Sequence, residues 1–353
     1  MSGQLTQGGQ ESKQRPFFRT KTFSYLTDWV FVIIMGILWG LLGKLEPFHR
    51  EFSLTDKTIM YPHKPDTITF GAAAAICSVI PLVAIIFLCI LRHWRECSNA
   101  IRNKKHPYKF YHDLHIGILS FAVAMTMNLM FTNVVKNLAG RKRPDFIARC
   151  KPEAGSSDPT WGLSTNDVCT ETDEYLMQDG QRSFPSGHSS FSFAGLGYMS
   201  FFIAGYFKLY DGRGFSHVAY LANFPLLFAT YVALTRVSDY RHHWQDVFIG
   251  SLLGLGMAYF VYRIYYPPLG SDDAGEPYNR RCQNGEYNKK IDGNGSVSNG
   301  PMGRTPDSLL PAPVSSGLPT EEDDHHGQGY MHAPLEANRL STTPLVPPQT
   351  YRQ

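Results

Sequence analysis

Charge is scarce in this chain of 353 residues, because only 18% of its side chains are Asp, Glu, Lys or Arg. The 33 basic and 30 acidic residues nearly cancel, which leaves a formal net charge of +3. Proteins that bind nucleic acid through bulk charge carry a clear basic excess, so this balance argues against a nucleic-acid partner. Hydrophobic side chains make up 43% of the chain. These averages hide a division of the sequence into two parts.

The C-terminal part, residues 267–353, is polar and rich in proline. It holds 12 of the 23 prolines, and its seven basic and eleven acidic residues give it a net charge of −4. Such a segment buries too little apolar surface to offset the loss of chain entropy on folding. The sequence therefore predicts a disordered tail, and residues 1–266 carry the remaining net charge of +7.

The first 266 residues contain six long stretches that have neither a charged residue nor a histidine. They are Trp29–Gly43, Thr67–Leu91, Ile116–Val135, Ser189–Phe207, Val218–Thr235 and Val247–Tyr262. A helix that crosses the hydrocarbon core of a bilayer needs roughly 17–25 residues, whereas helices of soluble proteins are shorter and have a polar face. We expect an all-α, polytopic membrane domain with six transmembrane helices over residues 23–266, preceded by a cytoplasmic segment, residues 1–22.

The basic residues outside these stretches predict how the chain is oriented. Four lie before the first span, and six lie between residues 92 and 109 with Glu96 as the one acidic residue there. By the positive-inside rule both segments are cytoplasmic, and six spans return the tail to the same side. The segment 136–188 faces away from the cytoplasm, yet it opens with four cations: Lys136, Arg141, Lys142 and Arg143. Binding of an anion would explain cations on this side.

Three polar clusters lie at span ends on this extracytoplasmic face. They are Lys136 followed by Arg143-Pro144, then Pro185-Ser186-Gly187-His188, then Thr235-Arg236 followed by His242 and Asp246. Odd spans run outward and even spans run inward, so all three clusters reach one membrane surface. We predict that the loops on this face form a single site.

The first group of residues in these clusters suits the binding of a phosphoryl group. Arg143 and Arg236 can each offer two parallel donors to a phosphate, and Lys136 adds a point charge. Ser186 and Gly187 stand at the predicted start of a helix, where backbone N–H groups and the positive end of the helix dipole attract anions. Catalysis of phosphoryl transfer consists mainly of such positioning and charge neutralisation.

The second group supplies a nucleophile and an acid. His242 and Asp246 are four residues apart, a spacing that puts two side chains on one helical face within hydrogen-bonding reach. The carboxylate would then orient the imidazole and stabilise the cation formed when its other nitrogen attacks phosphorus. His188 comes from a different span and is free to protonate the leaving oxygen. The neighbouring His243 breaks both spacings, and we expect it to be an interfacial histidine.

Together the clusters resemble the pattern K-x6-RP, PSGH and SR-x5-H-x3-D of the type 2 phosphatidic acid phosphatases, also called lipid phosphate phosphatases. The chain departs from that pattern at Thr235, where serine is usual. Because the hydroxyl is kept, we expect a small change in local packing. The resemblance covers residues from about 23 to 266, and within the family the sequence looks most like the fungal diacylglycerol pyrophosphate phosphatases.

The resemblance implies a metal-independent hydrolase without a cofactor, whose substrates are the membrane phospholipids phosphatidate, lysophosphatidate and diacylglycerol pyrophosphate. His242 would form a phosphohistidine, oriented by Asp246, with His188 as general acid. The site would be lumenal or extracellular, in a vacuolar, Golgi or plasma membrane, and a homo-oligomer is left open. Two alternatives also remain open: a lipid phosphotransferase with an alcohol acceptor, and a non-catalytic lipid-binding or transport relative.

Two of the six cysteines lie in the long loop on the extracytoplasmic face. Cys150 and Cys169 would be exposed there to an oxidising compartment, where disulfides form and persist. We expect them to be bridged, and two free thiols are the alternative.

Overall fold

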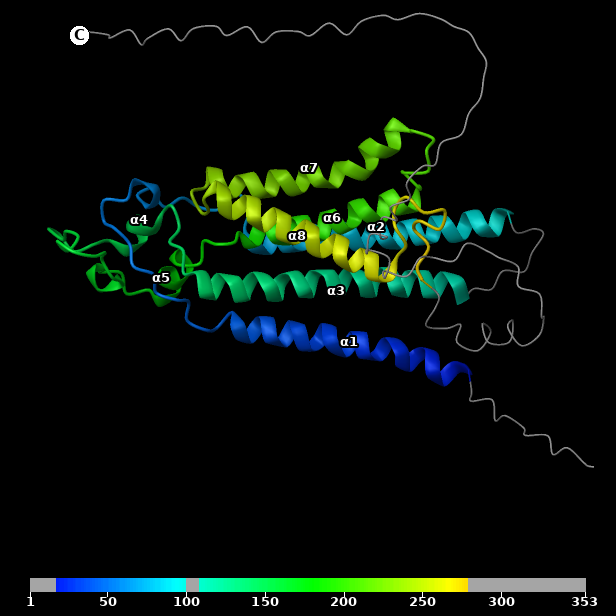
Figure 1. Cartoon of the computed structure of the whole chain (residues 1–353), viewed down its shortest axis with the longest axis horizontal. Coiled ribbons are helices and arrows are strands. Elements are labelled where there is room, and N and C mark those ends of the chain that lie inside the picture. Colours follow the sequence, from blue (N-terminus) through cyan, green and yellow to red (C-terminus); the bar gives the residue numbers. More distant parts are fainter. Residues whose placement is uncertain (1–16, 100–107, 279–353) are drawn as a thin grey trace, which may run out of the picture. The chain divides into compact units, whose positions relative to one another are not determined.

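The computed structural model describes residues 17–99 and 108–278, which form helices, turns and loops (Figure 1). Within these residues there is no β-strand, only two isolated bridges, Phe52 with Ser164 and Pro152 with Cys169. Six helices are long: α1 Phe17–Leu42, α2 Phe70–Asn99, α3 Tyr108–Ala139, α6 Gly187–Tyr206, α7 Ser216–Ser238 and α8 Trp244–Tyr265. They run side by side as a bundle (Figure 1). The described residues therefore have the predicted all-α architecture.

Five of the long helices, α1, α2, α3, α7 and α8, are long and apolar enough to cross a membrane. Helix α6 is the exception, although it has 20 residues and was expected to be a span. It packs against α2, α3, α7 and α8, and most of its side chains are buried among them. Because α6 has so little outer surface to present to lipid, serines and glycines replace the apolar residues that the other five carry. The chain is a polytopic membrane protein.

Small residues let α8 approach α6 closely. A side chain at Gly254 of α8 would collide with the backbone carbonyl of Ser190 in α6, and one at Gly250 would collide with that of Ser186. Small residues at such interfaces are the usual means by which membrane helices pack backbone to backbone. The contact continues to the helix ends, where the Ser186 N–H donates to the carbonyl of Asp246 at 2.9 Å. This packing joins two of the three predicted clusters.

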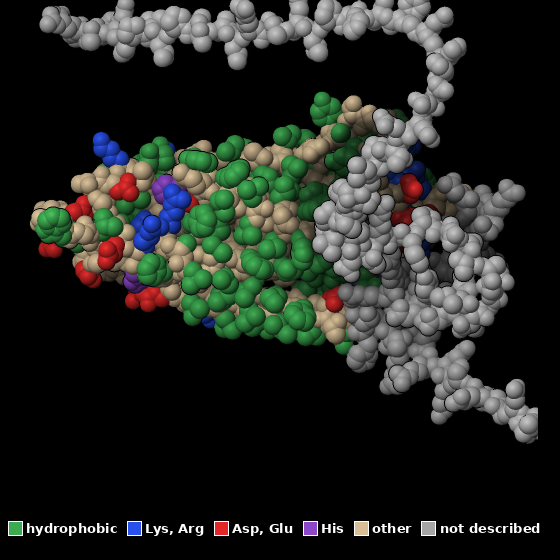
Figure 2. Space-filling view, viewed as in Figure 1, with side chains coloured by type: hydrophobic (Ala, Val, Ile, Leu, Met, Phe, Trp, Pro, Cys, Tyr) green, Lys and Arg blue, Asp and Glu red, His purple; other side chains and the backbone are tan. Residues whose placement is uncertain are grey.

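Loops and short helices gather at one end of the bundle and form what we call the cap, residues 43–69 and 140–186. It contains α4 (Phe146–Cys150), α5 (Glu174–Gly180) and the 3₁₀ helices η1 (Lys57–Ile59) and η2 (Asn166–Val168). A small core of Phe52, Ile59, Phe146 and Cys150 holds it together. The structure also joins Cys150 to Cys169 by a disulfide, with their Cα atoms 4.6 Å apart. Figure 2 shows charged and histidine side chains gathered at this end and hydrophobic ones along the helices.

The ordered part of the chain extends beyond residue 266, where we expected the disordered tail to begin. Residues 267–278 fold back onto the opposite end of the bundle. The Tyr278 N–H donates to the carbonyl of Tyr265 at 2.9 Å, and Arg92 of α2 donates to the carbonyl of Gly275 at 2.7 Å. Ala274 is buried. Packing by these twelve residues outweighs their polar composition, and the rest of the predicted tail lies outside the described residues.

Candidate active site

The three predicted clusters meet at the end of the bundle beneath the cap. Lys136 is in the last turn of α3, Ser186 and Gly187 begin α6, and Arg236 is in the last turn of α7. Asp246 is in the first turn of α8. The predicted topology is the reason, because each of these helix ends follows or precedes a loop on the same side of the bundle.

The start of α6 presents the positive end of a long helix beside Lys136. Ser186 is its N-cap, and the Ser186 hydroxyl accepts hydrogen bonds from the backbone N–H and the hydroxyl of Ser189. A Cβ atom added to Gly187 would lie 3.3 Å from Nζ of Lys136. Glycine at this position therefore lets the ammonium group approach the positive end of a long helix, and the two together favour an anion.

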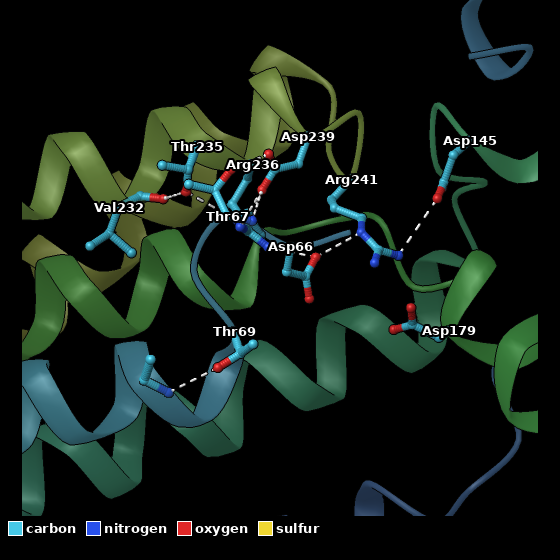
Figure 3. A network of polar contacts seen from close by, with 12 residues as sticks. Asp66, Thr67, Thr69, Asp145, Asp179, Val232, Thr235, Arg236, Asp239 and Arg241 are labelled. Carbon is cyan, nitrogen blue, oxygen red and sulfur yellow. Dashed lines mark hydrogen bonds and ion pairs between the residues drawn. The ribbon is translucent and has the colours of Figure 1, made fainter. Parts of the chain in front are cut away.

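The two predicted phosphate-binding arginines are buried and held by carboxylates. Arg143 donates from Nη2 to Oδ1 of Asp179 at 2.6 Å, while its Nε is buried without a partner among the described residues. Arg236 is 1% exposed and donates to Oδ2 of Asp239 at 2.6 Å and to Oδ1 of Asp66 at 3.1 Å (Figure 3). Guanidinium groups fixed in this way are oriented before any ligand arrives.

Thr235, the departure from the family pattern, keeps its hydroxyl in the arginine's environment. Its Oγ1 donates to the carbonyl of Val232 at 2.7 Å and accepts from Nε of Arg236 at 3.3 Å (Figure 3). A serine hydroxyl could make both contacts, so threonine at this position supports Arg236 by the same hydrogen bond.

The imidazole of His242 is buried and has a defined tautomer. Its Nδ1 lies 2.6 Å from the carbonyl oxygen of Ser183. A carbonyl oxygen only accepts, so Nδ1 carries the hydrogen and Nε2 keeps a lone pair. Burial, followed by the positive charges of Arg143 and Lys136, holds the pKa of His242 well below its usual value. The side chain is therefore a neutral imidazole with a free nitrogen, beside two cations.

The prediction that Asp246 contacts His242 is wrong. Helix α8 begins only at Trp244, with His243 as its N-cap, so His242 lies before the helix and the four-residue spacing does not put both on one face. Asp246 instead accepts from the Ser183 hydroxyl at 2.6 Å and from Nη1 of Arg141 at 2.6 Å. Asp246 thus reaches His242 only through Ser183.

His243 has a structural place, in agreement with the expectation that it is not catalytic. Its backbone N–H donates to Oδ2 of Asp246 at 3.1 Å, and its Nδ1 lies 3.3 Å from the same oxygen. The two residues form a capping box that satisfies the first N–H groups of α8.

His188 enters the site from the first turn of α6. Its ring packs edge-on against Phe70, with ring centroids 5.5 Å apart, and its Nε2 is buried without a partner among the described residues. Burial, followed by the positive charges of Arg236, Lys136 and Arg143, lowers the pKa of His188 to about 3. Buried polar atoms without partners are rare in folded proteins. Nε2 of His188 and Nε of Arg143 are two such atoms within one group of cations, which fits a site that binds an anion.

Four residues of this site were not among the predicted site residues: Asp66, Arg141, Ser183 and Asp239. Arg141 was recognised in the sequence only as a cation on the unexpected side of the membrane. Ser183 acts on His242 through its backbone, which no residue pattern reveals. Asp66 lies 70 positions before Lys136, in a part of the cap that carries none of the three motifs.

Acidic and histidine side chains are present in the site, but they do not gather as metal ligands. Among residues 17–99 and 108–278, no group of three or more such side chains is placed to hold a metal ion.

Comparison with known proteins agrees with this arrangement. The family model of the PAP2 superfamily matches residues 117–268. Lipid phosphate phosphatase 2 of Arabidopsis thaliana is 36% identical over 259 residues, which span 72% of this chain and 81% of the relative. Diacylglycerol pyrophosphate phosphatase 1 of Saccharomyces cerevisiae is 35% identical, over 69% of this chain and 80% of the relative. No solved structure matches the chain.

A probable diacylglycerol pyrophosphate phosphatase 1 of Schizosaccharomyces pombe is also 35% identical, over 77% of this chain and 93% of the relative. The family match, residues 117–268, contains the three motifs and helices α6, α7 and α8. The chain belongs to the PAP2 superfamily.

Proposed function

We propose that this protein is an integral-membrane lipid phosphate phosphatase. Its substrates are phosphatidate, lysophosphatidate and diacylglycerol pyrophosphate. Two of its relatives are named as a lipid phosphate phosphatase and a diacylglycerol pyrophosphate phosphatase. One observation carries the proposal: a neutral imidazole, His242, whose Nε2 has a free lone pair, lies under the charges of Arg143 and Lys136. A nucleophile beside buried cations suits attack on a phosphorus atom surrounded by anionic oxygens.

In the first step Nε2 of His242 attacks phosphorus and the bond from phosphorus to the ester oxygen breaks. The electron pair of that bond leaves with the oxygen, which takes a proton from Nε2 of His188. His188 carries this proton in the complex because the bound anionic phosphoryl group offsets the cations that lower its pKa. Lys136, Arg143, Arg236, the Ser186 hydroxyl and the Gly187 N–H neutralise the charge on the other phosphoryl oxygens. The products are a phosphohistidine and diacylglycerol, or phosphatidate when the substrate is the pyrophosphate.

In the second step water attacks the phosphohistidine. His188, now neutral, takes a proton from that water, and the bond between phosphorus and Nε2 of His242 breaks. Inorganic phosphate leaves, and both histidines return to their starting protonation states. Throughout the cycle the Ser183 carbonyl accepts the Nδ1 hydrogen of His242 and stabilises the positive charge on the modified ring.

We propose that the site faces the lumen or the extracellular space, in a vacuolar, Golgi or plasma membrane. The support is the basic composition of the segments at the opposite end of the bundle. A site at the helix ends suits a lipid whose acyl chains stay in the bilayer. A homo-oligomer is compatible with this arrangement.

Phosphate release from phosphatidate in detergent and EDTA tests the proposal. The wild type should release phosphate, and His242→Ala should lose at least about a thousandfold in rate because the nucleophile is gone. His217→Ala, an exposed histidine at the other end of α7, is the matched control and should retain the wild-type rate. No release by the wild type, or equal release by His242→Ala, contradicts the proposal. Transfer of the phosphoryl group to an added alcohol in place of water would favour the phosphotransferase alternative.

A further inference from the structure

One carboxylate of the cap lies between two arginines of the site. Oδ1 of Asp66 is 3.1 Å from Nη1 of Arg236 and 2.8 Å from Nε of Arg241 (Figure 3). Asp66 is in the segment that leads from η1 to α2, outside the stretch matched by the family model, residues 117–268. Two guanidinium groups repel one another, and the carboxylate with which both form ion pairs is what allows them to lie here. Nε of Arg241 pairs with Asp66 by charge and not as a hydrogen-bond donor.

The residue next to Asp66 strengthens this link. Thr67 donates from its backbone N–H and from its hydroxyl to the two oxygens of Asp239, at 2.8 and 2.6 Å. Asp239 in turn accepts from Nη2 of Arg236 at 2.6 Å. Two consecutive residues of the cap therefore hold one guanidinium group: Asp66 contacts Nη1 of Arg236 directly, and Thr67 holds Asp239, which contacts Nη2 (Figure 3).

Arg241 connects the same carboxylate to the nucleophile, because it immediately precedes His242. The backbone N–H groups of Arg241 and His242 both donate to the carbonyl of Arg236, at 3.0 and 3.2 Å. The turn between them includes Tyr240 with a φ of 56°, a conformation that L-residues seldom adopt. The far end of the Arg241 side chain lies 3.6 Å from Oδ2 of Asp145. The guanidinium group of Arg241 thus lies between the carboxylates of Asp66 and Asp145, while its backbone forms part of the turn.

We propose that Asp66 is a positioning residue that sets the guanidinium of Arg236 and, through Arg241, the turn that presents His242. It makes no contact with the reacting atoms. Its carboxylate couples the residue that holds the phosphoryl group to the residue that attacks it. The role rests on the proposed phosphatase function.

Asp66→Asn removes the charge and keeps the shape of the side chain. We expect kcat/KM for phosphatidate to fall by about 10- to 100-fold, mainly in kcat, because displacement of catalytic groups by about 1 Å costs that much. Asp66→Glu keeps the charge and should restore part of the loss. Asp158→Asn is the matched control, since Asp158 holds the part of the cap before η1, at the Ser53 hydroxyl and the Leu54 N–H, without touching either arginine. It should stay within about twofold of the wild type.

A double-mutant cycle separates positioning from general loosening of the cap. If Asp66 acts through Arg241, then Asp66→Asn combined with Arg241→Gln should lose no more kcat than the more severe single variant. Rates are compared at equal amounts of folded protein, and the thermal midpoint of each variant is measured in detergent to check that it folds. Losses that multiply, an Asp66→Asn rate within twofold of wild type, or equal losses in Asp66→Asn and Asp158→Asn overturn the inference. An inactive wild type would instead contradict the phosphatase function itself.

Discussion

The carbonyl oxygen of Ser183 accepts a hydrogen bond from Nδ1 of His242 at 2.6 Å. The hydroxyl of the same serine donates to Oδ2 of Asp246 at 2.6 Å. One residue therefore stands between the nucleophile and the carboxylate that were expected to touch. Because the contact to His242 comes from the backbone, it persists whatever side chain occupies position 183.

Ser183→Ala should consequently be a mild variant. It removes one hydrogen bond from Asp246, which keeps those from Arg141 and His243, and leaves the tautomer of His242 unchanged. A hydrogen bond to a charged group contributes about 1.5–3 kcal/mol, so we expect kcat to fall by roughly 10- to 100-fold at most, far less than in His242→Ala. Steady-state kinetics on phosphatidate measures the difference. A Ser183→Ala enzyme as inactive as His242→Ala would mean that the hydroxyl takes part in the chemistry directly.

The pH dependence of kcat/KM should report the cations around His242. Only the neutral imidazole attacks, and burial together with Arg143 and Lys136 lowers its pKa well below the usual value of 6.5. Activity that depends on this group is therefore present above that lowered pKa and lost as the pH falls through it. Arg143→Gln removes one cation, so the pKa of His242 rises and the acid limb moves to higher pH.

The measurement compares acid limbs with one substrate, so that ionisation of the substrate phosphate is common to all variants. Lys151→Gln, which removes an exposed cation of the cap paired with Glu171, is the control and should leave the limb in place. An acid limb that stays unchanged or moves down in Arg143→Gln would show that this ionisation does not belong to His242.

The sequence predicts which helix ends meet, because motif spacing and alternating span direction together determine it. The spacing of Lys136 and Arg143, and the place of Ser186 before a span, required only that the helices end where charges begin. The contact of His242 with Asp246 was predicted wrongly because it assumed a continuous helix. His243 and Asp246 cap α8 instead, and the helix starts at Trp244, two residues after His242.

The role of Asp66 could not be predicted, for a different physical reason. Its partners Arg236 and Arg241 are 170 and 175 positions away, and no local pattern specifies which loop carboxylate neutralises a buried arginine. Likewise, α6 is not among the helices that are apolar enough to cross a membrane because of its central place in the bundle. Both features depend on tertiary packing that a single sequence does not display.

The disulfide between Cys150 and Cys169 should stabilise the cap. It closes a loop of about twenty residues, and a loop of this size contributes on the order of 3 kcal/mol by restricting the unfolded chain. The double variant Cys150→Ser with Cys169→Ser should melt on the order of 5–10 °C lower in detergent. Reductant should lower the thermal midpoint of the wild type and leave that of the variant unchanged. A wild type that is insensitive to reductant, with both thiols open to alkylation, would mean that the bridge does not form.

The orientation of the molecule can be tested at its two ends with a thiol reagent that does not cross membranes. Trp161 of the cap is 91% exposed, and Cys97 is exposed near the end of α2 at the opposite end of the bundle. The experiment uses sealed vesicles with the cytoplasmic face outward and chains in which Cys282 is replaced by serine. Cys97 should react at once, because the positive-inside rule predicts that the basic segment after α2 is cytoplasmic.

With Cys97 also replaced by serine, Trp161→Cys should react only after detergent opens the vesicles, since the cap then faces the lumen. Cys77 and Cys89 are buried in α2 and serve as the internal background. The opposite labelling pattern would place the cap in the cytoplasm. In that case Lys136, Arg141, Lys142 and Arg143 would obey the positive-inside rule, and their position would no longer argue for an anion site. The buried atoms of Arg143 and His188 that lack partners would then carry that argument alone.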